Sequence, residues 1–209
     1  MITRLHVSSF VGLTIVVWLA ALWFQGQPVL SLSFLKPFSL VVGVLAAFSV
    51  AFNIWIWRLP ILRGWYIKIP YIRGTWRIDL KSDWIDPNTQ KGIEPIQCYL
   101  VVRQTLSSLS ARLITPESIS HSVAYSITLE SDEIYRLHVV YRNEPKIELQ
   151  GVRSEIHHGA FKMEITCPNY ESMDGFYWSD RKTRGSMRGV ILGRQLCDSY
   201  ESASKLSAG

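Results

Sequence analysis

The first 77 residues of the chain contain no aspartate and no glutamate, although they hold seven of its 22 basic residues. The rest of the chain carries 15 basic and 17 acidic side chains, a formal charge of −2. Nucleic-acid binding requires lysine and arginine clustered on the folded domain. The net charge of +5 therefore belongs to the amino-terminal segment, and we expect no DNA or RNA partner.

Cysteines and catalytic motifs are scarce. Cys98, Cys167 and Cys197 lack the paired spacing of a disulfide framework or a zinc site, so we expect reduced thiols, two or three of them in the core. The sequence has no G-x-S-x-G, P-loop or H-E-x-x-H motif. His157 and His158 are adjacent on a predicted strand, point to opposite faces and are unsuited to sharing a metal ion. These absences predict a protein without enzymatic activity, cofactor or metal.

Two long apolar stretches open the chain, from about Leu5 to Phe24 and from Phe38 to Trp57. Each approaches the ~20 residues that a membrane-spanning helix requires. We predict a two-helix transmembrane hairpin, residues 5–24 and 38–57, within a segment 1–60. Basic residues follow the second stretch, which predicts that both termini and the later domain are cytoplasmic. A cleaved signal peptide is the alternative for the first stretch, but no clear A-x-A site follows it.

Small residues recur at every fourth position of the second stretch: Ser39, Gly43, Ala47 and Ala51. Such a strip lets another helix backbone approach closely. Two interpretations are about equally supported: self-association of several chains in the membrane, and packing against the first helix of the same chain.

A basic linker, residues 61–70, leads to a segment with strand-like alternation, residues 71–197. Turn residues separate eight predicted strands, and the last residues, 198–209, are expected to form a flexible tail. We predict an all-β domain of about eight antiparallel strands in a small closed β-barrel, which is wide enough for side chains or one small ligand. The predicted strands are 73–80, 96–105, 107–115, 121–130, 133–142, 155–165, 170–178 and 181–192.

The last two strands break the apolar-inside pattern. Tyr177, Ser179, Arg181 and Thr183 occupy alternate positions, so in a continuous strand they would point to the same face. If this set faces inward, Arg181 requires an anionic partner, and a phosphate suits its planar fork. The alternative, which the spacing favours modestly, is a hairpin turn near Asp180 with a solvated Arg181.

Four segments together resemble a known family. They are Arg73 to Trp76, the motif Gly-x-Tyr-Trp-Ser-x-Arg-x-Thr-x-Gly over 175–185, Thr115-x-x-Ser118-x-Ser120, and Tyr141-x-Asn143-x-Pro145. With the two apolar stretches, they resemble the two-transmembrane, β-strand-rich effectors of CBASS, the cyclic-oligonucleotide-based antiphage system. Ser179 departs from the threonine expected in that family but keeps the hydroxyl.

The resemblance implies a function. A partner nucleotidyltransferase makes a cyclic dinucleotide, the barrel binds it, the protein self-associates, and the helices disrupt the lipid bilayer of the bacterial inner membrane. Phosphates require cationic or hydroxyl donors and bases require aromatic faces. The candidate ligand-binding residues are Tyr177, Ser179, Arg181, Thr183, Tyr141, Trp76, Tyr125, Ser118 and Ser120.

The alternative function is a membrane-anchored barrel that binds a lipid or a protein partner without a nucleotide signal. A lipid carrier should have an almost wholly apolar lumen, so hydroxyl groups facing inward would argue against it. A purely structural anchor is a further alternative.

Overall fold

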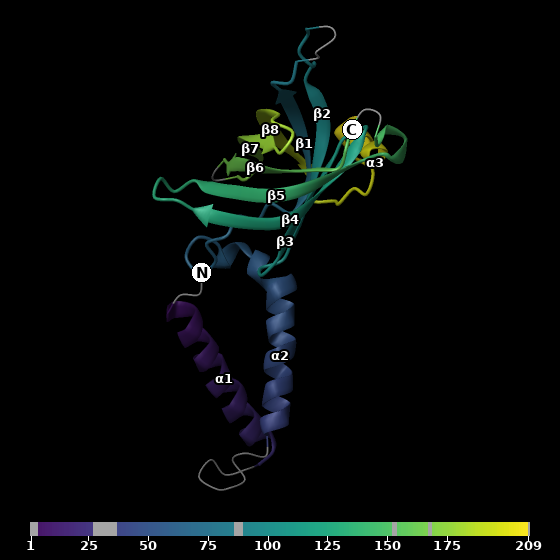
Figure 1. The fold of residues 1–209 in the computed structure, drawn as a ribbon. Coiled ribbons are helices and arrows are strands. Elements are labelled where there is room, and N and C mark those ends of the chain that lie inside the picture. Colours follow the sequence, from purple (N-terminus) through teal and green to yellow (C-terminus); the bar gives the residue numbers. More distant parts are fainter. Residues whose placement is uncertain (1–3, 27–36, 86–89, 152–153, 167–168, 209) are drawn as a thin grey trace. The chain divides into compact units, whose positions relative to one another are not determined.

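A computed structural model divides the chain into two compact units, Met1–Lys68 and Ile69–Gly209. We call them the amino-terminal unit and the barrel unit. The structure describes residues 4–26, 37–85, 90–151, 154–166 and 169–208 (Figure 1). Cys167 and most of the segment that connects the two apolar stretches lie outside the described residues.

The amino-terminal unit contains two helices where the sequence predicts them. They are α1 (Arg4–Phe24) and α2 (Phe38–Ile54), followed by the 3-10 turns η2 (Ile56–Arg58) and η3 (Pro60–Leu62). Proline is absent from both helices, so nothing interrupts their backbone hydrogen bonds. Within the described residues, however, no helix combines the length and the apolar character that crossing a membrane requires. The predicted transmembrane hairpin is therefore not confirmed.

The barrel unit confirms the predicted closed barrel of eight antiparallel strands (Figure 1). Each strand pairs with its neighbour in sequence, and the first pairs with the last. Closure gives the strands partners on both sides and reduces the exposed sheet edge. The strands are β1 (Gly74–Ser82), β2 (Ile96–Gln104), β3 (Leu109–Ile114), β4 (Ser118–Leu129), β5 (Tyr135–Pro145), β6 (His157–Ile165), β7 (Ser172–Ser179) and β8 (Arg184–Gly193).

Hydroxyl side chains form the tight turns that the sequence indicates. The Thr115 hydroxyl accepts hydrogen bonds from the backbone N–H groups of Glu117, at 3.2 Å, and Ser118, at 2.9 Å. This local bonding replaces ladder bonds where β3 turns back into β4. It fixes which residues of β4 face the lumen.

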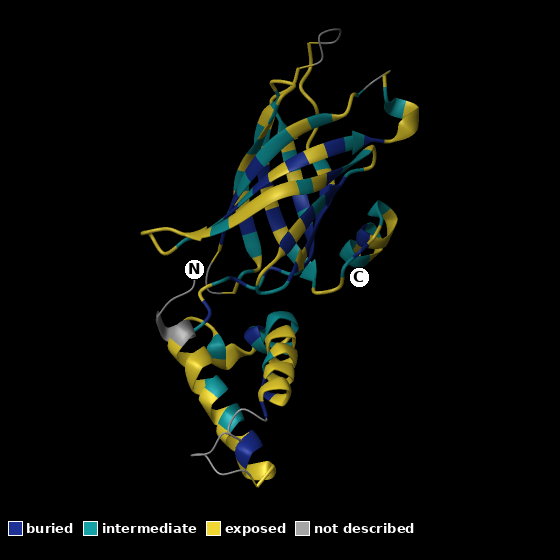
Figure 2. Ribbon diagram, turned by 60° about the horizontal axis from the view of Figure 1, so that its bottom comes forward, coloured by how far each residue is buried: buried dark blue, intermediate teal, exposed yellow. Residues whose placement is uncertain are grey.

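The alternation of buried and exposed residues along the strands matches the prediction (Figure 2). In β5, for example, Leu137 and Val139 are buried, whereas Val140 and Arg142 are exposed. Successive side chains on a strand point to opposite faces, so one face fills the lumen and the other meets solvent. The core of the lumen includes Trp76, Ile78, Leu100, Leu137, Met163 and Met187, each almost completely buried.

The prediction of a flexible tail is wrong for Tyr200–Ala208, which form a helix, α3. Its Ala203 is buried beside Tyr99 and Cys197 on the outer wall of the barrel. The helix is too short to be stable by itself in water, so this packing is what supports it. Cys98 and Cys197 are free and buried, as predicted.

Candidate functional site

Polar side chains gather at one end of the barrel lumen. In the register of the sheet, Ser120 of β4 lies opposite Asn143 of β5, and Ser122 lies opposite Tyr141. Ser179 and Tyr141 both lie opposite Gly159 of β6. This end therefore brings together residues that are far apart in the sequence. We call the set the polar mouth: Ser120, Tyr141, Asn143, Tyr177, Ser179 and Thr183.

Two glycines make room for the tyrosines of the polar mouth. A Cβ atom on Gly159 would collide with the hydroxyl of Tyr141 and the backbone carbonyl of Trp178. A Cβ on Gly185 would collide with the backbone carbonyl of Lys81 and lie 2.7 Å from Cε1 of Tyr177, closer than real carbon contacts allow. Because both glycines stand opposite or beside a tyrosine in the sheet, each tyrosine can lie across the barrel wall.

Short hydrogen bonds join the smaller polar side chains of the mouth. The Ser120 hydroxyl donates to Oδ1 of Asn143 at 2.9 Å, and both residues are buried. The hydroxyl oxygens of Ser179 and Thr183 are 2.8 Å apart, across the β7–β8 turn. Each hydroxyl keeps further lone-pair or proton capacity, so these pairs can orient donors toward a ligand.

Both tyrosines remain protonated phenols at neutral pH. Burial raises the pKa of Tyr141 above its usual range, and the nearby Tyr177 and the charge of Asp180 raise it further. Burial also raises the pKa of Tyr177, although a hydrogen bond with Ser82 acts in the opposite direction. A protonated phenol is a hydrogen-bond donor, which an anionic ligand needs.

The β7–β8 connection is a tight turn, and Arg181 lies outside the lumen. Lys182 has a φ of 59°, the left-handed conformation that such a turn requires. Arg181 is exposed, and its guanidinium donates to the Ser154 hydroxyl at 2.9 Å. The inward-facing alternative for Arg181 is therefore wrong: the strand has ended at Ser179, so its parity does not continue to residue 181.

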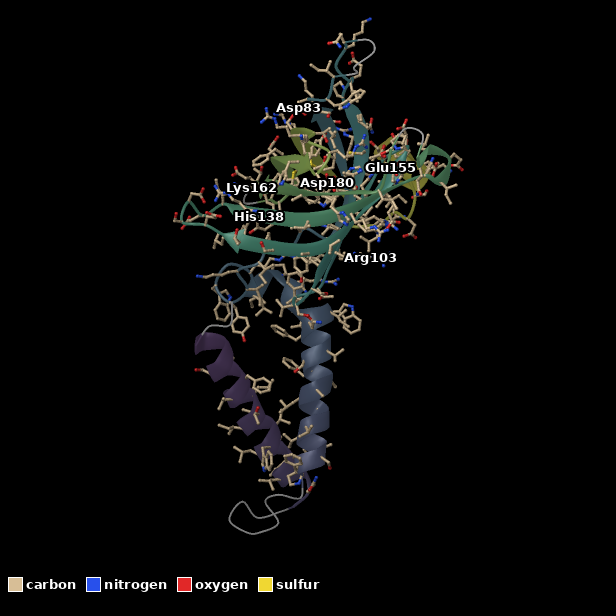
Figure 3. All side chains as sticks on the ribbon, viewed as in Figure 1. Asp83, Arg103, His138, Glu155, Lys162 and Asp180 are labelled. Carbon is tan, nitrogen blue, oxygen red and sulfur yellow. The ribbon has the colours of Figure 1, made fainter. Side chains whose placement is uncertain are left out.

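Charged groups on the loops at this end are tied together in pairs. Asp180 accepts a hydrogen bond from the backbone N–H of His158 at 2.9 Å. The backbone N–H and the side-chain Nε of Arg184 each donate to Asp83 at 2.9 Å, and these hydrogen bonds, the backbone one most of all, lower the pKa of the Asp83 carboxyl. Figure 3 marks Asp83 and Asp180, which follow the ends of β1 and β7. The rim thus carries charge, whereas the polar mouth itself offers neutral donors.

Two of the remaining predicted ligand residues, Trp76 and Tyr125, lie away from the polar mouth. Trp76 is fully buried in the core, and its indole N–H donates to the carbonyl of Ile72 at 2.9 Å. Tyr125 donates to the Ser107 carbonyl at 3.2 Å, in the β2–β3 turn at the opposite end of the barrel. Ser118 lies at the same end as the polar mouth, two residues before Ser120, but its hydroxyl contacts that of Thr115 at 3.0 Å within the β3–β4 turn.

Three residues of the site were missed in the sequence: Asn143, Gly159 and Gly185. The alternation that places Tyr141 inside also places Asn143 inside, so that signal was present. Nothing in the sequence shows which tyrosine each glycine faces, because that depends on strand register. His157 and His158 lie on opposite faces of β6, and no group of described residues is arranged to hold a metal ion.

Comparisons with known proteins point to one class of receptor. A family model described as Cap15, cyclic dinucleotide receptor domain, matches residues 67–189. A relative from Yersinia aleksiciae, CD-NTase-associated protein 15, is 26% identical over 184 residues, which cover 87% of this chain and 82% of the relative. The matched segment includes all eight strands except the last residues of β8.

Proposed function

Because the chain belongs to the family of Cap15 cyclic dinucleotide receptor domains, we propose that it is a CBASS effector whose polar mouth binds a cyclic dinucleotide. The observation that carries this proposal is the pair of tyrosines that lie against glycines at one end of the lumen. We propose a receptor role, not a catalytic one, for these residues.

The chemistry of the polar mouth suits such a ligand. A cyclic dinucleotide presents two phosphates, which accept hydrogen bonds, and two flat bases, which stack on aromatic rings. Tyr141 and Tyr177 combine a ring with a protonated hydroxyl, and Ser179 and Thr183 add hydroxyl donors. Arg181, exposed on the β7–β8 turn between Ser179 and Thr183, has the planar fork of donors that matches a phosphate. An almost wholly apolar lipid has no acceptor groups for these hydrogen-bond donors.

The source and the effect of the signal form the second part of the proposal. The Yersinia relative is named as a protein associated with a CD-NTase, and we infer that a partner nucleotidyltransferase makes the ligand. We infer that the amino-terminal unit then acts on a lipid bilayer at the bacterial inner membrane. Helices α1 and α2 expose Phe10, Val16, Phe48 and Val50, and large exposed apolar surfaces are typical of membrane or protein contacts.

Calorimetric titration of the full chain in detergent, against a panel of cyclic di- and trinucleotides, tests the proposal. We expect saturable binding of one of them. Tyr177→Phe should weaken that binding roughly 10- to 100-fold, because a hydrogen bond to a charged group contributes about 1.5–3 kcal/mol. Arg181→Ala should weaken it without unfolding the barrel.

Tyr125→Phe is the matched control, because it removes the same hydroxyl at the other end of the barrel. It should leave the affinity unchanged. Equal losses in Tyr177→Phe and Tyr125→Phe would place the ligand elsewhere. A folded protein that binds no member of the panel would favour the lipid- or protein-binding anchor.

A further inference from the structure

The outer wall of the barrel has a hollow lined by basic side chains from three neighbouring strands. It is a cavity of about 230 Å³, and its lining includes Arg103 of β2, Arg112 of β3 and His121 of β4. In the sheet, Arg112 lies opposite His121, and Arg103, labelled in Figure 3, lies opposite Ser110. These residues alternate with buried core residues of their strands, so they face away from the lumen. The hollow is therefore separate from the polar mouth.

A local irregularity of the sheet lies beside this hollow. Ladder pairing between β3 and β4 is confined to Arg112–Ile114 against Ile119–His121. Next to it, the hydroxyl of Ser122, which also lines the hollow, accepts the hydrogen bond of the Ala111 N–H at 3.0 Å. A bulge between Ser122 and Ala124 follows. Bulges interrupt a ladder and redirect the neighbouring side chains, so the wall is not closed by regular backbone pairing here.

Two guanidinium groups converge on one oxygen atom at the hollow. Nη2 of Arg103 and Nη2 of Arg112 lie 3.5 Å and 3.4 Å from the same atom, Oδ1 of Asp198. Arg112 also donates to the carbonyl of Cys197 at 2.9 Å, and its side chain is only 26% exposed. A guanidinium that is already positioned loses little further freedom when it binds an anion. The place between the two arginines thus already accommodates an anionic oxygen.

Asp198 compensates this positive charge only weakly. Its side chain is 80% exposed, and both contacts are longer than the about 2.7–2.9 Å of a strong charge-assisted hydrogen bond. By contrast, Arg136, Arg184 and Arg188 each have a carboxylate oxygen within 2.9 Å. Exposed ion pairs contribute little to stability, and among the described residues no carboxylate lines the hollow itself. A stronger anion can therefore take the place of Asp198.

We propose that this hollow binds a phosphate group, which replaces Asp198 between the two arginines. A phosphate presents several oxygens and accepts hydrogen bonds from two planar guanidinium groups at once. The Ser110 hydroxyl and the His121 ring, on the same lining, add donors. The ligand class is a phosphate monoester or a diphosphate, carried either by a soluble molecule or by the headgroup of an acidic lipid. This inference does not depend on which ligand occupies the polar mouth.

Calorimetric titration of the full chain in detergent with inorganic pyrophosphate tests the site. The affinity of Arg103→Gln should fall at least about tenfold, because charge-assisted hydrogen bonds to the anion are lost. Arg188→Gln is the matched control: Arg188 is also exposed on the outer face of a strand, but it is paired with Asp174 and does not line the hollow. Its affinity should match wild type. Thermal melting checks that both variants are folded.

Removal of the Asp198 carboxylate should have the opposite effect. Asp198→Asn should raise the affinity for pyrophosphate roughly two- to fivefold, because an exposed ion pair no longer competes for the arginines. Asp174→Asn changes the net charge by the same amount away from the hollow and should leave the affinity at the wild-type value. Cyclic dinucleotide binding should be unchanged in Arg103→Gln, because this residue faces away from the polar mouth.

Competition experiments identify the source of the phosphate group. Phosphatidic acid in mixed micelles represents a lipid headgroup, adenosine monophosphate represents a soluble phosphate ester, and the more effective competitor of pyrophosphate gives the source. Displacement by neither compound would overturn the proposal. So would the absence of saturable pyrophosphate binding to wild type, equal affinities of the two arginine variants, or equal affinities of the two aspartate variants.

Discussion

At the scale of single residues, the candidate site depends on where side chains are missing. Tyr141 and Tyr177 are large, and a side chain on Gly159 or Gly185 would occupy the space that each ring uses. Protein interiors are packed closely enough that one added methyl group displaces its neighbours. The positions of the two tyrosines are therefore determined as much by the glycines as by the tyrosines themselves.

Gly159→Ala is expected to disturb both the barrel and the site. The new Cβ meets the Tyr141 hydroxyl and the rigid Trp178 carbonyl, and overpacking of this kind costs about 1–3 kcal/mol. Chemical denaturation should show that loss in the free energy of unfolding, and calorimetry should show weaker binding of the cyclic dinucleotide.

Gly193→Ala, also in a strand, is the control. A Cβ there meets nothing within 4 Å, so its free energy of unfolding should change by less than about 0.5 kcal/mol. Wild-type stability and affinity in Gly159→Ala would show that Tyr141 does not depend on the glycine.

At the scale of elements, the exposure of residues along α2 bears on the two interpretations of its small-residue strip. Ser39, Gly43 and Ala47 are exposed, Ala51 is half-buried, and a Cβ on Gly43 meets nothing within 4 Å. Val41, which lies about 200° around the helix from Gly43, is buried. The face that packs within the amino-terminal unit is thus opposite the strip. This arrangement supports the proposal that the strip serves self-association.

Gly43→Leu or Ala47→Leu should prevent ligand-induced leakage of liposomes that contain the protein, because the larger side chain keeps helix backbones apart. Ligand affinity, measured by calorimetry, should remain at the wild-type value. Leakage should persist in Val42→Leu, which enlarges an exposed residue outside the strip. Undiminished leakage in both strip variants would remove the strip from the mechanism, and no leakage in the wild type would contradict action on a bilayer.

At the scale of the whole barrel unit, the carboxyl-terminal segment folds back onto the outer wall. Arg112 donates to the carbonyl of Cys197 at 2.9 Å, and the ring of Tyr200 lies 5.1 Å from that of Tyr99, edge to face. Ala203 is completely buried in this contact. Helix α3 therefore covers an aromatic residue that points away from the lumen, and it belongs to the folded unit.

Ala203→Leu should lower the free energy of unfolding by about 1–3 kcal/mol, because the added atoms have no space against the barrel wall. Ala208→Leu makes the same change at an exposed position at the end of the helix and should be nearly neutral. Denaturant unfolding followed by tryptophan fluorescence compares the two. Equal stability of both variants would show that α3 contributes little to the barrel.

The sequence by itself determined the order of the two amino-terminal helices and the eight strands. Alternation of apolar and polar residues predicted all eight strands to within a few residues, because side-chain direction on a strand is a local property. The apolar stretches located both helices. The hydroxyl-bearing residues Tyr177 and Ser179, two positions apart on one strand, also indicated the end of the lumen where the polar mouth lies.

Only the tertiary structure decided the composition of that mouth. Arg181 lies outside the lumen because the strand ends at Ser179. Trp76 is buried in the core, and Tyr125 lies at the other end of the barrel. The tyrosines that Gly159 and Gly185 face are set by strand register, and α3 depends on a surface built by β2. These are contacts between distant segments, and a pattern of neighbouring residues carries no information about them.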